Sequence, residues 1–293
     1  MKYGIWVLFF ALMILGACTE NTDGTGINTG SDHHQERENE QTGSGGQTTT
    51  DQNKNEPEKN EQTNQQQEAD APAEPQYKIN AETSSVVPID DANEKVVLLT
   101  FDDAPDEYAL EMANTLKSMD ANAIFFINGH FLESTEGQNM LKKIDDMGFV
   151  IGNHTYNHSY LPDLSEQEQR DQIVSLNDTI EDIIGKRPQF FRPPNGANTD
   201  FTKKLAEQEG MVSMNWTYGY DYFEPYMDTE KIKEAMISGK GPEVDVPYSL
   251  LKPGANLLMH DREWTAAALE DIVTGLRDKG YKIVDPMRIQ TIE

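Results

Sequence analysis

The chain has 293 residues and a formal net charge of −27 at pH 7, from 24 basic and 51 acidic side chains. Residues 1–76 carry −9 of this charge, which leaves −18 on residues 77–293 and argues against nucleic acid or anionic lipid as a charge-driven partner. The single cysteine, Cys18, excludes an intramolecular disulfide and a cysteine-ligated zinc site.

The first 18 residues have the form of an export signal. Lys2 precedes an apolar run over residues 5–15, which is too short to span a bilayer and suits the core of a signal peptide. Small residues directly before Cys18 resemble the lipobox of a bacterial lipoprotein. This resemblance implies that Cys18 is lipidated and anchors the mature chain at the extracytoplasmic face of the cell membrane. An ordinary signal peptide or an uncleaved anchor is the alternative.

Residues 19–76 have the composition of a spacer, because Gln, Asn, Thr, Glu and Gly dominate and apolar side chains are few. Such a segment cannot bury enough apolar surface to offset the entropy lost on ordering. We therefore expect a disordered, polar and acidic linker. The remaining residues, 77–293, have a length that suits one α/β domain.

Strand and helix signals alternate along this second part. Short apolar runs predict seven strands, over residues 96–101, 123–127, 149–152, 189–191, 211–216, 256–259 and 281–284. Apolar residues at helical spacing predict helices over 107–119, 138–147, 165–184, 200–208, 229–237 and 265–279. This alternation implies a parallel sheet with helices outside it, either a slightly irregular (β/α)7 barrel or an open doubly wound sheet.

Polar side chains follow the predicted strands at their C-terminal ends, where barrel enzymes carry their active sites. The candidates are Asp102, Asp103, His154, His158, Arg192, Asn195, Asp221 and His260. His154 and His158 are four residues apart, so on a helical turn both imidazoles would face one side and could bind one metal ion. An aspartate at a neighbouring strand end would complete a set of two histidines and one carboxylate, with positions left open for water.

The other candidates have side chains that could interact with one another as ion pairs or hydrogen-bonded pairs. Asp102 and Asp103 are either the cap of a turn or part of an active site, and their side chains are expected to point to opposite sides of the strand. Arg192 lies between an apolar strand and two prolines, which suggests a fixed partner for a carboxylate. Asp221 and His260 match a carboxylate that orients an imidazole. His130, after the second strand, is interpreted as structural, with a contact to the substrate as the alternative.

Five segments in this order resemble the motifs of the polysaccharide deacetylase family, the NodB homology domain of carbohydrate esterase family 4. They are TFDDAP at 100–105, HTYNH at 154–158, RPPNG at 192–196, Asp221, and LMH at 258–260. The resemblance implies an irregular (β/α)7 barrel of the NodB type. It also implies a divalent metal, usually Zn²⁺ with Co²⁺ and Ni²⁺ as alternatives, held by Asp103, His154 and His158.

The same resemblance implies roles for the remaining residues. Asp102 would be the general base, oriented by Arg192, and His260 the general acid, tuned by Asp221. Contacts to the substrate or its oxyanion are expected from Asn195, Tyr222 and Leu258. The implied activity is removal of acetyl groups from the N-acetylated sugars of a cell-wall or extracellular polysaccharide, either peptidoglycan or a chitin-like polymer. An O-acetyl esterase and a catalytically weak, lipid-anchored glycan-binding protein are the alternatives.

Three positions depart from the family pattern. Ala104 replaces the usual glycine, which is harmless only if that residue has a negative φ. Asn195 stands where tyrosine is common, and Tyr222 follows Asp221 where tryptophan is common. The implied ligands, base and acid are all present, which favours an active enzyme.

The lipid anchor is tested by Cys18→Ser. Because the lipid is attached to the cysteine sulfur, we expect the variant to leave the membrane fraction for the medium or to accumulate unprocessed. Cell fractionation followed by immunoblotting measures this. Deletion of residues 19–76, with the cysteine retained, is the control and should leave membrane retention unchanged. Normal cleavage of Cys18→Ser with full membrane retention would contradict lipid anchoring.

Overall fold

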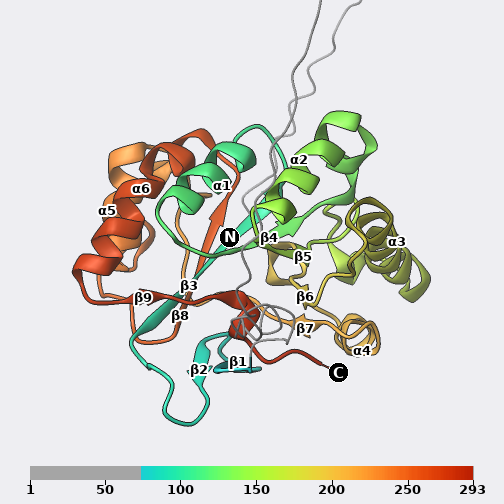
Figure 1. Cartoon of the computed structure of the whole chain (residues 1–293), viewed down its shortest axis with the longest axis horizontal. Helices are drawn as coiled ribbons and strands as arrows, with labels where there is room; N and C mark the ends of the chain where they lie inside the picture. Colours follow the sequence, from blue (N-terminus) through green and yellow to red (C-terminus); the bar gives the residue numbers. More distant parts are fainter. Residues whose placement is uncertain (1–73, 293) are drawn as a thin grey trace, which may run out of the picture. The chain divides into compact units, whose positions relative to one another are not determined.

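The computed structural model describes residues 74–292, so Cys18 and almost all of the predicted linker lie outside the described residues. Within them, seven parallel strands form one curled sheet (Figure 1). The strands are β3 (Val96–Ala104), β4 (Ile124–Ile127), β5 (Val150–Asn153), β6 (Phe190–Phe191), β7 (Val212–Ser213), β8 (Ala255–His260) and β9 (Lys282–Ile283). Each corresponds to a predicted strand.

The strands follow the order β7-β6-β5-β4-β3-β8, and β9 pairs with β3. Val97 pairs with Ala255 of β8 on one edge of β3 and with Ile283 of β9 on the other edge. β9 therefore pairs with the start of β3 on the same edge that β4 pairs with near the end of β3. The segment that follows β7 lies beside β8, because the Leu258 N–H donates to the Tyr218 carbonyl at 2.9 Å. The sheet therefore curls into the irregular (β/α)7 barrel that the sequence predicts.

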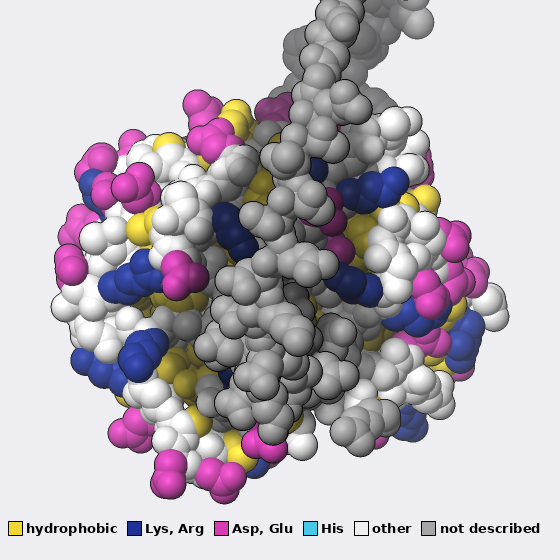
Figure 2. Space-filling view, viewed as in Figure 1, with side chains coloured by type: hydrophobic (Ala, Val, Ile, Leu, Met, Phe, Trp, Pro, Cys, Tyr) yellow, Lys and Arg dark blue, Asp and Glu magenta, His cyan; other side chains and the backbone are white. Residues whose placement is uncertain are grey.

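Helices cover the outside of the sheet (Figure 1). They are α1 (Ala109–Ser118), α2 (Thr135–Asp146), α3 (Glu166–Ile184), α4 (Asp200–Gln208), α5 (Thr229–Ser238) and α6 (Glu263–Asp278). A capping box is present at the start of α3, where Ser165 and Glu168 bond each other's backbone. No helix among residues 74–292 combines the length and the apolar character needed to cross a membrane. Acidic side chains are scattered over the visible periphery of the domain in Figure 2, in keeping with its net charge.

Alternating strand residues build two separate cores. Val97, Leu99 and Phe101 of β3 belong to the large cluster between the sheet and the helices. Leu98 points the other way and joins Ile124, Phe126, Phe190 and Met214 inside the barrel. Further along β3 the inward positions become polar, at Thr100 and Asp102. The barrel is thus apolar toward the N-terminal ends of its strands and polar at their C-terminal ends.

A short hairpin that the sequence did not predict lies at the N-terminal end of the barrel. Strands β1 (Tyr77–Ile79) and β2 (Val86–Pro88) pair antiparallel, and Tyr77 and Val86 join the inner core. The Val86 N–H donates to the carbonyl of Gly254 at 2.8 Å. A Cβ atom on Gly254 would lie 2.1 Å from the Val86 carbonyl oxygen, so this contact requires glycine.

Candidate active site

Three predicted metal ligands meet at the C-terminal end of the barrel. Oδ1 of Asp103 lies 3.5 Å from Nε2 of His158 and 3.9 Å from Nε2 of His154. One ligand atom from each residue lies within 4.8 Å of the other two. Two imidazole nitrogens and one carboxylate oxygen form a donor set that suits a divalent ion such as zinc.

His154 is held with one nitrogen directed at this cluster. Its side chain is buried, and Nδ1 lies 2.7 Å from the backbone carbonyl of Arg192. We assign the proton to Nδ1, which donates to that carbonyl, so Nε2 carries the lone pair. Burial lowers the pKa of His154 and outweighs the carboxylates of Asp102 and Asp103, which act to raise it. A neutral imidazole is the form that binds metal.

The segment that carries both histidines is an irregular loop, so the predicted helical turn is wrong. Thr155 and His158 have φ values of 70° and 52°, which interrupt any right-handed helix, yet the two imidazole rings still lie 5.0 Å apart. The loop is held from β4, because the Asn128 amide donates to the carbonyls of His154 at 2.7 Å and Thr155 at 3.1 Å. Asn128 was not among the predicted site residues.

Asp102 and Arg192 form a buried ion pair inside the barrel. Nη1 of Arg192 donates to Oδ1 of Asp102 at 2.7 Å, and both residues are almost fully buried. The same nitrogen donates to the Thr100 hydroxyl at 2.8 Å, and the guanidinium lies 4.3 Å from the centre of the Phe126 ring. Oδ2, the other oxygen of Asp102, lies 3.5 Å from Nε2 of His154. The predicted partner of Arg192 is therefore the carboxylate that borders the metal cluster.

Both adjacent aspartates face His154, contrary to the expectation that they point to opposite sides of the strand. The cause is the backbone of Asp103, which has a φ of 60° beside an irregularity in the pairing of β3 with β4. Ala104 is a buried residue of β3 and is not among the residues with positive φ. Because its φ is not positive, alanine can replace the usual glycine at this position.

His260 stands at the end of β8, paired in register with Asp102 on β3. Nδ1 of His260 lies 2.7 Å from Oδ1 of Asp221, and its backbone N–H donates to Oδ2 at 2.6 Å. Burial of His260 opposes protonation, but the carboxylates of Asp221, which also accepts its hydrogen bond, Asp102 and Asp103 together outweigh burial and raise the pKa to about 9. Asp221 is itself fixed by the Thr265 hydroxyl at 2.8 Å and by the Trp264 indole N–H, which donates to its backbone carbonyl at 2.9 Å.

Two of the three residues predicted to contact the substrate, Tyr222 and Leu258, lie near His260. The ring of Tyr222 stands edge-on to His260, with centroids 5.6 Å apart, and its side chain is exposed. Leu258 is buried two residues before His260 on β8, so the two share a face of the strand. Asn195 is exposed, with a φ of 56°. His130 lies outside the metal cluster, exposed and with Nδ1 3.2 Å from the Tyr156 carbonyl.

Two further residues at the site were missed, although both directly follow His260. Asp261 accepts backbone N–H groups at the start of α1, from Asp106 at 2.6 Å, Tyr108 at 2.7 Å and Ala109 at 3.0 Å. Arg262 donates from Nη2 to Oδ2 of Asp103 at 2.7 Å. Their position at a strand end was the signal that could have identified them.

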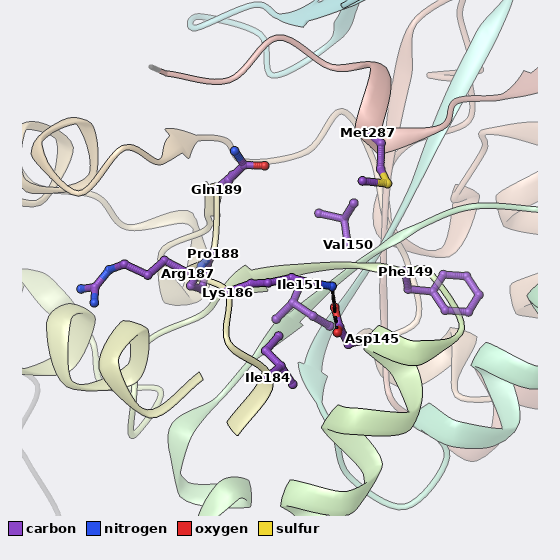
Figure 3. Close-up of a pocket in the computed structure, with 11 residues that line it drawn as sticks. Asp145, Phe149, Val150, Ile151, Ile184, Lys186, Arg187, Pro188, Gln189 and Met287 are labelled. Atoms are coloured by element: carbon purple, nitrogen blue, oxygen red, sulfur yellow. Dashed lines mark hydrogen bonds and ion pairs between the residues drawn. The ribbon is translucent and has the colours of Figure 1, made fainter. Parts of the chain in front are cut away.

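A cavity of about 410 Å³ lies at the opposite end of the sheet (Figure 3). Phe149, Ile151 and Ile184 form part of its lining, and Lys186 forms an ion pair with Asp145 at its edge, at 2.9 Å. Because β5 begins at Val150, this cavity borders the N-terminal end of that strand. It contains none of the predicted site residues and is separate from the candidate active site.

Comparison with known proteins agrees with this geometry. The polysaccharide deacetylase family model matches residues 89–214. The chain is 31% identical to a peptidoglycan-N-acetylglucosamine deacetylase of Bacillus cereus, over 68% of this chain and 70% of the relative. It is 28% identical to PdaA, a peptidoglycan-N-acetylmuramic acid deacetylase of Bacillus subtilis, over 67% of this chain and 73% of the relative.

A similar solved structure is that of BA3943 from Bacillus anthracis, described as a carbohydrate esterase family 4 pseudoenzyme. The TM-score is 0.57 at 30% identity, over 65% of this chain and 63% of BA3943, so the match spans just under two thirds of that protein. A mutant of BA3943 with restored enzymatic activity is equally similar, with a TM-score of 0.57 and 32% identity over 65% of each chain. Fold, motif order and sequence identity agree, and the chain belongs to the polysaccharide deacetylase family.

Proposed function

We propose that this chain is a metal-dependent polysaccharide N-deacetylase that acts on acetylated peptidoglycan. The observation that carries the proposal is a carboxylate and an imidazole beside a cluster of side chains that could hold one metal ion. Asp102 and His260 lie in register on adjacent strands, and Asp102 reaches within 3.5 Å of the ligand His154. The family and the peptidoglycan deacetylases among the relatives support a hydrolase of carbon–nitrogen, non-peptide bonds.

In this proposal the site residues divide the reaction between them. Asp103, His154 and His158 would hold the metal, which when bound lowers the pKa of water and polarises an acyl oxygen. Asp102, held by Arg192, takes the proton of the attacking water. As the bond between acetyl carbon and sugar nitrogen breaks, His260 donates its proton to the nitrogen. The products are acetate and a free amino sugar.

The rim residues supply substrate contacts in the same scheme. The backbone N–H of Asn195 stabilises the oxyanion, and Tyr222 and Leu258 border the acetyl group. The position of Tyr222 edge-on to His260 supports this placement for the aromatic residue. Negative charge on the domain favours a neutral glycan that becomes cationic when its amine is released.

The proposal extends to the location of the enzyme. A chain lipidated at Cys18 and carried on residues 19–76 would be anchored at the extracytoplasmic face of a bacterial cell membrane, within reach of the cell wall. The form of the apolar run before Cys18 supports this location, as does a substrate that itself lies outside the cell.

A glycan-binding protein without activity is the second candidate, because BA3943 is a pseudoenzyme with the same fold. Asn195 and Tyr222 are the residues of this site that favour it, since both depart from the family pattern. Against it stand the complete cluster and the hydrogen-bonded supports of Asp102 and His260. Acetate release from peptidoglycan and from acetylated chitooligosaccharide, with and without a chelator, decides between the two. Parallel assays on an O-acetylated glycan test the esterase alternative.

The metal site predicts that His154→Ala lowers bound metal and activity together, because the variant removes a buried nitrogen ligand. Metal content after dialysis, measured by elemental analysis, is the readout. His130→Ala is the matched control, since that histidine lies outside the cluster and should keep full occupancy. Unchanged metal content in the double variant His154→Ala, His158→Ala would refute the assignment.

The division of labour between the two aspartates predicts different outcomes for matched variants. Asp102→Asn removes the base but leaves the three ligands, so metal should remain while turnover falls by about 10²–10⁴-fold. Asp103→Asn removes an anionic ligand, so metal affinity should fall and excess metal should restore part of the activity. Metal analysis beside acetate-release kinetics measures both effects. Equal loss of metal from the two variants would show that the roles are wrongly assigned.

The pKa of His260 predicts the alkaline limit of activity. The imidazole must be protonated to act as the acid, so with a pKa of about 9 its contribution is present below pH 9 and lost as the pH rises through that value. Asp221→Asn removes the carboxylate that raises this pKa, so the alkaline limb of kcat should move to lower pH. Asp278→Asn, at the far end of α6, removes the same charge as a control. If the alkaline limb of kcat does not move in Asp221→Asn, His260 is not the group whose deprotonation causes that limb.

A further inference from the structure

We propose that Arg262 is a positioning residue for the metal ligand Asp103, an inference that rests on the proposed metal site. Its guanidinium holds one oxygen of the carboxylate, so the other oxygen alone is presented to the metal. Nη2 of Arg262 donates to Oδ2 of Asp103 at 2.7 Å. Oδ1 of Asp103 is the oxygen that faces His158 and His154.

The arginine is anchored on a rigid part of the fold. Nη1 of Arg262 donates to the backbone carbonyl of Asp261 at 2.7 Å. The Asp261 side chain in turn accepts three backbone N–H groups where α1 begins. One nitrogen of the guanidinium therefore binds the backbone of Asp261, and the other binds the metal ligand Asp103. Only a planar group with several donors can make both contacts at once.

Asp103 needs such a support more than an ordinary strand residue does. It has a φ of 60°, in the sparsely populated left-handed region. Its carboxylate is 18% exposed, so water would compete for an oxygen that was left free. The ion pair with Arg262 replaces that water with a fixed donor.

The adjacent aspartate is supported in the same way. Oδ1 of Asp102 binds Arg192, while its Oδ2 faces His154. Each carboxylate of the pair thus has one oxygen on an arginine and the other directed at the cluster. The two arginines differ in burial, because Arg192 is fully buried and the Arg262 side chain is 36% exposed.

Two effects of Arg262 on metal binding oppose each other. Its positive charge repels a cation, whereas its hydrogen bond orients the anionic ligand. Because the guanidinium is partly exposed, water and salt screen the charge. The hydrogen bond acts at contact distance and is not screened in this way. We therefore expect orientation to dominate, so that removing the guanidinium weakens metal binding.

The test is equilibrium titration of the metal-free protein with zinc chloride against a chromophoric chelator. Arg262→Met should bind zinc about 10–100-fold more weakly than wild type, as is usual when a group that orients a ligand is lost. Arg277→Met is the matched control, because it removes an exposed arginine of α6 that bonds the carbonyls of Met119 and Asp120, away from the cluster. It should bind zinc as tightly as wild type.

Arg262→Lys separates orientation from charge. Lysine keeps the positive charge, but its donors are all on one nitrogen, so it lacks the planar fork with which Nη1 and Nη2 of Arg262 reach Asp261 and Asp103 separately. We expect its zinc affinity to lie nearer to that of Arg262→Met than to wild type. Melting curves of the metal-free variants establish that each is folded, and the lysine variant alone carries the test if the methionine variant is not. Zinc affinity equal to or tighter than wild type in either variant would overturn the proposal.

Failure of this inference differs from failure of the proposed function. If wild type binds zinc and releases acetate while Arg262→Met binds zinc equally well, the positioning role is wrong and the deacetylase stands. If wild type binds zinc but releases no acetate, the titration still measures the role of Arg262. A wild-type protein that binds no zinc would overturn the positioning role together with the metal site.

Discussion

The buried ion pair between Arg192 and Asp102 is the interaction on which the candidate site depends. Removing one partner of such a pair typically costs about 3–5 kcal/mol, because the other charge is left buried without compensation. The cost of burying both is offset by the Thr100 hydroxyl, the Asn215 carbonyl and the ring of Phe126. Since Arg192 follows β6 and Asp102 lies in β3, the pair also spans the barrel interior between strands that are not neighbours.

The same arginine links the proposed base to a proposed metal ligand. Its guanidinium binds Asp102, while its backbone carbonyl accepts a hydrogen bond from Nδ1 of His154. One residue therefore sets the orientation of the Asp102 carboxylate and the tautomer of His154. A displacement of Arg192 would disturb both functions at once, which is why its position inside a close-packed apolar barrel matters for the chemistry.

The environment gives the two histidines His260 and His154 opposite pKa shifts. His260 is kept protonated by Asp221, whereas His154 is kept neutral by burial, although both are imidazoles at strand ends of one barrel. The difference arises from the partner of Nδ1, which is a carboxylate for His260 and a backbone carbonyl for His154.

The sequence by itself determined the alternation of strands and helices and the residues that stand at the strand ends. Apolar periodicity and short polar motifs are local signals, and they survive without knowledge of the fold. Only the tertiary structure decided that Asp102 and Asp103 face the same histidine, because this depends on the left-handed backbone of Asp103. It also decided the roles of Asn128 and Arg262, whose partners lie 26 and 159 residues away and leave no pattern in the chain. Hydrogen bonds over such separations form only once the barrel has brought the strand ends together.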